Sequence, residues 1–365
     1  MLLYKKLLIW LVAICIFFSS GYPAYGAETD PTDMESDISV RIERIVSAAY
    51  SDMPGQYEIS NAITIYNADV PCIYYIIPVF CNQECIGTVE VGTTGGMSLS
   101  HDSTLYTSIT ELPSDDCLLY TSGGIVYAEY SGELYELYDT GFDSAQNNEF
   151  MSLSYAEKAA EIDNYWEVTE LSFDISDVVE AAVMPCIANT EISLFVLPSF
   201  TVKTINCPIT DFVTQNGYNI CWAACIATIS NYRTGSHYTA EQIASAMNHA
   251  YTSEYYFGAY TEEIVSALDY YDLDYTSTES KLGWSSIKNC IQQDRPFIIG
   301  LSRDGGGHVV TAYGYSCLNN DSDNYSYMRY VTVWDPKNCQ RTFEYDANYY
   351  SWDGLSYYWA ATVYE

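Results

Sequence analysis

Basic residues are scarce in this sequence of 365 residues, which has 14 Lys and Arg, 48 Asp and Glu, and only four His. The shortage holds in both halves, with four basic against thirty acidic residues at 27–204 and eight against eighteen at 205–365. Nucleic-acid binding needs clustered Lys and Arg to neutralise phosphates, so we expect no nucleic-acid partner. Zinc is disfavoured because no Cys-x-x-Cys pair occurs, and we expect neither a metal nor another cofactor.

Long apolar runs are also lacking after the start of the chain. There, Lys5 and Lys6 precede an apolar run from Leu7 to Phe18, and small residues follow at Ala24-Tyr25-Gly26. This order predicts a secretory signal peptide at 1–26, because the run is too short to span a bilayer comfortably. The alternative is a retained membrane anchor. We expect a secreted protein, extracellular or at the cell surface, and a monomer.

Cysteine, in contrast, is frequent, with 12 residues. Cys15 lies in the predicted signal peptide, five others lie in the first half and six in the second. In an exported protein some of them should pair as disulfides, and Cys81 and Cys85 flank a turn that a disulfide could close. If Cys221 is kept free as a nucleophile, the second half has five other cysteines, an odd number. Either another thiol is then free or one bridge joins the halves.

Residues 27–204 have the pattern of an α+β domain. Apolar residues recur at helical spacing from 39 to 50, and strand-like segments follow at 73–80, 86–91, 117–121, 125–130 and 134–138. His101 is the only histidine of this half, and a lone histidine is usually a surface or loop residue. Since no nucleophile and base come together here, we expect this domain to have no chemistry of its own.

Residues 205–365 place helices before strands, which is also an α+β order. Helices are expected at 219–232, 239–250, 261–270 and 284–293, and strands at 297–301, 308–315, 328–334, 340–345 and 358–364. The first of these helices is apolar nearly all round, which predicts a buried central helix.

Cys221 stands at the start of that buried helix. There the helix dipole and unpaired N–H groups favour the thiolate and lower the pKa of the thiol. Gln215, six residues earlier, could aim its amide N–H at the oxygen of a tetrahedral intermediate and form an oxyanion hole with the backbone N–H of Cys221. The alternative is that Cys221 is one more buried or disulfide-bonded cysteine. Cys225, one helical turn later, is expected to fill the core or form a disulfide.

His308 follows three glycines and heads an apolar strand, which would hold its ring rigidly as a general base. His237 and His249 lie on polar segments, where we expect structural or solvent-facing roles. Asp335 ends a later apolar strand and precedes a proline, so it could accept a hydrogen bond from the imidazole Nδ1 and orient the ring. The alternative is an ordinary turn at the strand end.

In this order, the motifs Gln-x5-Cys-Trp-Ala, Gly-His-Val-Val and Asp-Pro resemble those of papain-like cysteine peptidases. The resemblance covers about Cys207 to Glu365. It is greatest to bacterial members such as staphopain, streptopain and the peptidases that process bacteriocin leaders. It implies a helical lobe and an antiparallel β-barrel-like lobe at 205–365. It also implies the following roles: attack by Cys221, acid–base work by His308, orientation by Asp335 and oxyanion support by Gln215. Papain carries asparagine where this sequence has Asp335, which leaves the pH optimum open.

The resemblance also suggests a role for residues 27–204. Secreted relatives carry an N-terminal pro-segment that assists folding and covers the cleft until it is cut away. We therefore expect a zymogen whose α+β pro-domain inhibits the enzyme, with cleavage between Ala188 and Ile205, near Lys203. Its partners would be a protein or peptide substrate and its own pro-domain. The alternative is a permanent binding domain.

Three other functions remain open on the sequence alone. One is a cysteine amidase that acts on peptidoglycan, and another is a peptidase restricted to one specific peptide. The third is a secreted, non-enzymatic binding protein on the same scaffold, which the four chemically competent positions argue against.

Overall fold

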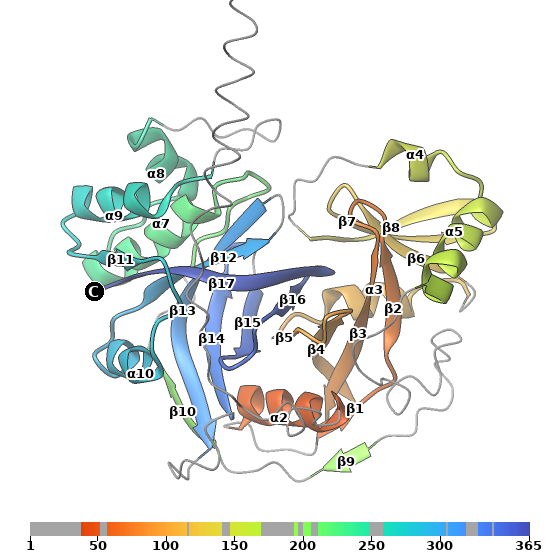
Figure 1. Cartoon of the computed structure of the whole chain (residues 1–365), viewed down its shortest axis with the longest axis horizontal. Coiled ribbons are helices and arrows are strands. Elements are labelled where there is room, and N and C mark those ends of the chain that lie inside the picture. Colours follow the sequence, from red (N-terminus) through yellow and green to blue (C-terminus); the bar gives the residue numbers. More distant parts are fainter. Residues whose placement is uncertain are drawn as a thin grey trace, which may run out of the picture. The chain divides into compact units, whose positions relative to one another are not determined.

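The computed structural model describes residues 38–51, 57–114, 117–140, 147–168, 193–195, 200–205, 211–248, 258–303, 306–318, 328–337 and 339–365. All of them belong to one compact unit, 37–365. They form a mixed fold of helices and one large sheet, with the elements labelled in Figure 1. The predicted signal peptide, Cys186, Cys207 and His249 lie outside the described residues. Within them, no helix is both long and apolar enough to cross a membrane.

The first half begins with a helix and continues mainly as strands. Its elements are α2 (Ile38–Tyr50), β1 (Tyr57–Ile59), β2 (Ile63–Asn67), β3 (Cys72–Cys81), β4 (Glu84–Gly92), β5 (Met97–Ser100), α3 (Thr104–Thr110), β6 (Leu118–Ser122), β7 (Ile125–Tyr130), β8 (Glu133–Asp139), α4 (Asn148–Met151), α5 (Tyr155–Val168) and β9 (Ser193–Phe195). The predicted helix and all five predicted strands are present. The pattern missed the short strands and helices, which are too brief to show periodicity.

The hairpin of β3 and β4 shows why Cys81 and Cys85 form no disulfide. Asn82 and Gln83 both have positive φ, 52° and 71°, as a tight two-residue hairpin turn requires. In the resulting register Cys81 pairs with Glu84, and Cys85 pairs with Phe80. Because neighbouring strand residues point to opposite faces, the two thiols lie on opposite sides of the hairpin. The expected disulfide between Cys81 and Cys85 is therefore wrong, and both are free thiols.

The second half contains four helices and eight strands among the described residues. They are β10 (Phe200–Thr204), α7 (Cys221–Thr234), α8 (Ala240–Ala246), α9 (Thr261–Tyr270), β11 (Thr276–Thr278), α10 (Trp284–Gln292), β12 (Phe297–Arg303), β13 (Gly306–Leu318), β14 (Arg329–Asp335), β15 (Cys339–Glu344), β16 (Tyr350–Trp352) and β17 (Leu355–Tyr364). Helices α7, α8 and α9 lie together, and α7 packs against β13 (Figure 1). Helix α7 is buried, as its apolar sequence predicts, and ends at Gly235 in the left-handed conformation.

Strand pairing joins the two halves. Strand β5 pairs antiparallel with β15, with Leu99 opposite Thr342. His101 lies just after β5, where its ring packs edge-on against Tyr50 and its Nε2 is 3.4 Å from Thr342 Oγ1. Burial lowers the pKa of His101 to about 4. His101 is thus a neutral, half-buried residue in the bend after β5, where the two halves meet in one sheet.

The segment in which we expected cleavage contains two paired strands. Strand β9 pairs with β1 in the first half, whereas β10 pairs with β13 in the second. Lys203 lies within β10, opposite Tyr315. A protease needs an unpaired, extended substrate, so a paired residue such as Lys203 is a poor site. Residues 188–192 and 196–199 of the expected stretch lie outside the described residues.

Candidate active site

Cys221 is the first residue of α7 and is only partly buried. Ile220, the residue before the helix, provides no side-chain cap, so the first backbone N–H groups are not capped by that side chain. Burial alone raises the pKa of Cys221. The hydrogen bond and charge of His308, with backbone hydrogen bonds at Val309 and Trp222, outweigh burial, and the pKa lies below that of an ordinary thiol. The site therefore favours a thiolate.

His308 lies near the start of β13, the strand that packs against α7. Its Nε2 is 2.8 Å from Asp335 Oδ1. The expected contact through Nδ1 is wrong, because Nε2 is the ring nitrogen that reaches Asp335. Cys221 forms a hydrogen bond with the same imidazole. Burial lowers the pKa of His308, but the charge and hydrogen bond of Asp335, followed by those of Cys221, raise it to about 9. The imidazolium is therefore the stable form near neutral pH.

Asp335 ends β14 and is fully buried. Its Oδ1 also accepts a hydrogen bond from the backbone N–H of Lys337 at 3.1 Å, and its Oδ2 accepts one from Trp352 Nε1 at 2.6 Å. Arg341 Nε forms an ion pair with Oδ2 at 3.3 Å. Burial raises the pKa of Asp335, but His308, Arg341 and Lys337 hold it well below its usual range. Asp335 is a permanent anion that stabilises the imidazolium.

Gln215 lies in the loop before α7 and is buried. Its Nε2 donates to the carbonyl oxygen of Tyr218 at 2.8 Å, and its backbone N–H donates to the carbonyl of Pro336, also at 2.8 Å. The second contact fixes Gln215 beside the strand end that carries Asp335. The amide has a second N–H, which is the group an oxyanion would use.

The competing residues have other surroundings. Cys225 is completely buried, and its thiol donates to the carbonyl of Val309 at 3.5 Å. Burial raises the pKa of Cys225 well above that of an ordinary thiol, so it fills the core as a neutral group. His237 is exposed. In the part of the chain that the structure describes, no group of three or more His, Cys, Asp or Glu side chains suits a metal ion.

The sequence analysis did not identify three residues that stabilise the Asp335 carboxylate. Trp352 and Arg341 contact its Oδ2, and Lys337 contributes a second buried cation. The only sequence signal was Asp353-Gly354, a dipeptide typical of a two-residue hairpin turn that follows Trp352. That signal predicts the turn but not its partners.

Residues 201–350 match the sequence profile of the family described as papain-like cysteine protease AvrRpt2. All four candidate residues fall within this range. The segment is a papain-like cysteine peptidase, and hence a hydrolase. No curated protein matches the chain. The narrower likeness of the peptidase to staphopain, streptopain or leader-processing enzymes stays a prediction.

Proposed function

We propose that the peptidase is a bacterial, exported cysteine endopeptidase that uses Cys221, His308 and Asp335, with Gln215 in the oxyanion hole. The observation that carries the proposal is the chain of contacts from the partly exposed Cys221 through His308 to the buried Asp335. The pKa shifts of these three residues agree, because each favours a thiolate beside an imidazolium. Export rests on the predicted signal peptide.

These residues would divide hydrolysis into two steps. The sulfur of Cys221 attacks the substrate carbonyl carbon, and the carbonyl oxygen becomes an oxyanion held by Gln215 and the backbone N–H of Cys221. His308 gives its proton to the leaving nitrogen, the C–N bond breaks and a thioester remains. The neutral His308 then takes a proton from water, which attacks the thioester and releases the carboxylic acid and the free cysteine. Asp335 keeps the ring oriented throughout.

The zymogen form is a second part of the proposal. We place the activating cut between Phe195 and Phe200 rather than near Lys203, since β9 and β10 pair with different halves of the chain. A cut there would leave both strands paired. It agrees with the start of the family match at residue 201. The first half would hold the uncut enzyme inactive and assist its folding.

The test compares residues 27–365 as wild type with the variants Cys221→Ala and Cys225→Ala, in the presence of a thiol reductant and casein. Wild type and Cys225→Ala should cut the link between Phe195 and Phe200 and then casein, whereas Cys221→Ala should do neither. Chain lengths are followed by mass spectrometry. If wild type leaves casein intact even after the link is cut by an added protease, general proteolysis is wrong. Digestion of purified cell walls would then test the amidase, and a peptide library would test the single-peptide enzyme.

A further inference from the structure

Strands β3 to β5 of the first half hold a hairpin turn of the second half. The turn, Asp353-Gly354, joins β16 to β17, and both residues have positive φ, 52° and 77°. Glu90, on β4, accepts hydrogen bonds from the backbone N–H of Asp353 at 3.0 Å and of Gly354 at 2.7 Å. Ser351 Oγ donates to the same carboxylate at 2.7 Å. Burial and the charge of Asp353 raise the pKa of Glu90, whereas Arg341 and these donors lower it and favour the ionised carboxylate.

The turn packs closely against strands β3 to β5. A Cβ on Gly354 would lie 2.5 Å from the ring of Tyr74 in β3, so only glycine can occupy the position. The thiol of Cys72 donates to the carbonyl of Gly354 at 3.0 Å. Ser98 Oγ, from β5, donates to the carbonyl of Ser351 at 2.6 Å. Three strands of the first half therefore fix one turn of the peptidase.

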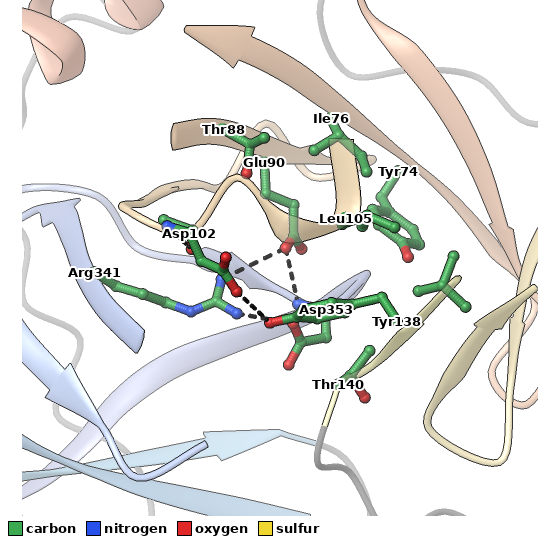
Figure 2. Close-up of a pocket in the computed structure, with 12 residues that line it drawn as sticks. Tyr74, Ile76, Thr88, Glu90, Asp102, Leu105, Tyr138, Thr140, Arg341 and Asp353 are labelled. Atoms are coloured by element: carbon green, nitrogen blue, oxygen red, sulfur yellow. Dashed lines mark hydrogen bonds and ion pairs between the residues drawn. The ribbon is translucent and has the colours of Figure 1, made fainter. Parts of the chain in front are cut away.

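The held turn supports Asp335 through two side chains. Trp352, just before the turn, donates to Asp335 Oδ2 at 2.6 Å. Asp353 Oδ1 accepts a hydrogen bond from Arg341 Nη2 at 2.8 Å, and the guanidinium lies over the Trp352 ring, 4.7 Å from its centroid. Arg341 Nη1 lies 3.6 Å from Glu90 Oε2. Figure 2 shows Glu90 joined by dashed lines to both Arg341 and Asp353.

Electrostatic interactions connect the same residues to His308. Three buried carboxylates (Asp335, Asp353 and Glu90) face two buried cations (Arg341 and Lys337), and the imidazolium of His308 supplies the third positive charge. Loss of the Glu90 charge would disfavour that imidazolium. The other ionisable groups beside Glu90 are Cys72 and Tyr74, together with Asp102 and Tyr138, which line a cavity of about 30 Å³ next to it.

We propose that Glu90 is a positioning residue of the peptidase and that the first half of the chain stays in the active enzyme as a support for Asp335. The inference rests on the catalytic role proposed for His308 and Asp335. An activating cut between Phe195 and Phe200 would then produce two pieces that remain bound. The β5–β15 pairing and the hydrogen bonds that Glu90 accepts from the turn both hold the two pieces together.

The decisive comparison is Glu90→Gln against Glu129→Gln. Glu129 is also a buried glutamate of the first half, but its partners are Lys158 at 2.7 Å and Tyr120 at 3.0 Å. Both variants should unfold at lower temperature. Only Glu90→Gln should lower kcat, by roughly tenfold with KM little changed, because the triad is misplaced rather than the substrate pocket. It should also move the alkaline limit of activity to lower pH.

A second readout needs no substrate. In a Cys221→Ala background, NMR titration of the His308 ring should give a lower pKa with Glu90→Gln than without it, while Glu129→Gln should leave the titration unchanged. Identical His308 titrations and kcat values in the two variants would overturn the positioning role. If Glu90→Gln does not fold, Ser351→Ala should shift the titration less but in the same direction, and no shift would overturn the proposal. A shift in an enzyme that cleaves no peptide would reject the proposed function alone.

The lasting role of the first half has its own test. A recognition site for a specific protease is inserted between Phe195 and Phe200, and the cut protein is passed through a gel-filtration column. The two pieces should elute together and keep their activity. If they separate and the piece that starts at residue 200 keeps full kcat, the first half is a detachable pro-domain and the inference is wrong.

Discussion

The backbone N–H of Gln215 donates to the carbonyl oxygen of Pro336 at 2.8 Å, so the loop before the nucleophile is bonded to the residue after Asp335. Trp334 reinforces the link, because its Nε1 donates to the carbonyl of Val213 at 3.1 Å. The two segments lie more than a hundred residues apart in the chain, yet these hydrogen bonds hold the loop that carries Gln215 beside the strand end that carries Asp335. Displacement of either segment would disturb both Gln215, the proposed oxyanion donor, and the contact of Asp335 with His308.

The Gln215 side chain should matter for the rate and little for binding. We expect Gln215→Ala to lower kcat by roughly 10²- to 10³-fold with a nearly unchanged KM, because an oxyanion donor acts only in the transition state. Steady-state kinetics on a peptide substrate measure both constants. Glu241→Gln is the control, since Glu241 bonds the neighbouring Asn216. A loss confined to KM would instead make Gln215 a substrate-binding residue.

Activity should depend on pH through two groups. Cys221 must be a thiolate, and its lowered pKa places the acid limit below the range of an ordinary thiol. His308 must be protonated, and its pKa of about 9 places the alkaline limit there. The pH profile of kcat/KM should therefore be a broad bell, with a wide plateau around neutral pH. If the activity rises only in the pH range where an ordinary cysteine thiol ionises, Cys221 and His308 do not form an ion pair.

Local patterns in the sequence predicted much of the peptidase, but not what holds it to the first half. Helix α9 and strand β7 have the predicted bounds, 261–270 and 125–130, because each is a strong periodic segment between turns. Cys221, His308 and Asp335 could be found because each stands at or near the end of such a segment, whereas Gln215 lies in a loop and was found by its spacing from Cys221. Strand β5 has only four residues, and its pairing with β15 leaves no local signal. The choice of Nε2 over Nδ1 likewise depends on the approach of β14 to β13.

Asp335 should also be important for stability. Asp335→Ala leaves Arg341 and Lys337 short of one counter-ion in a buried cluster, so we expect a loss of about 3–5 kcal/mol in the free energy of unfolding. Asp346→Ala is the matched control. Asp346 pairs with Arg329 at a partly exposed site, where an ion pair contributes at most about 1 kcal/mol. Urea unfolding at pH 7 measures both variants. Equal losses would show that the buried charges are not coupled to Asp335.

The state of the cysteines gives the last prediction. In unfolded protein without reductant, at least seven cysteines should react with a thiol reagent, because the structure has them as free thiols: Cys72, Cys81, Cys85, Cys221, Cys225, Cys290 and Cys339. In native protein at mildly acidic pH, iodoacetamide should label Cys221 first, since its pKa is lowered and its side chain is partly exposed. Cys225, one turn along the same helix, should stay unlabelled because it is buried and its pKa is raised. Peptide mapping by mass spectrometry separates the two sites. Labelling of both at similar rates would mean that neither the His308 contact nor the exposure of Cys221 makes it the more reactive thiol.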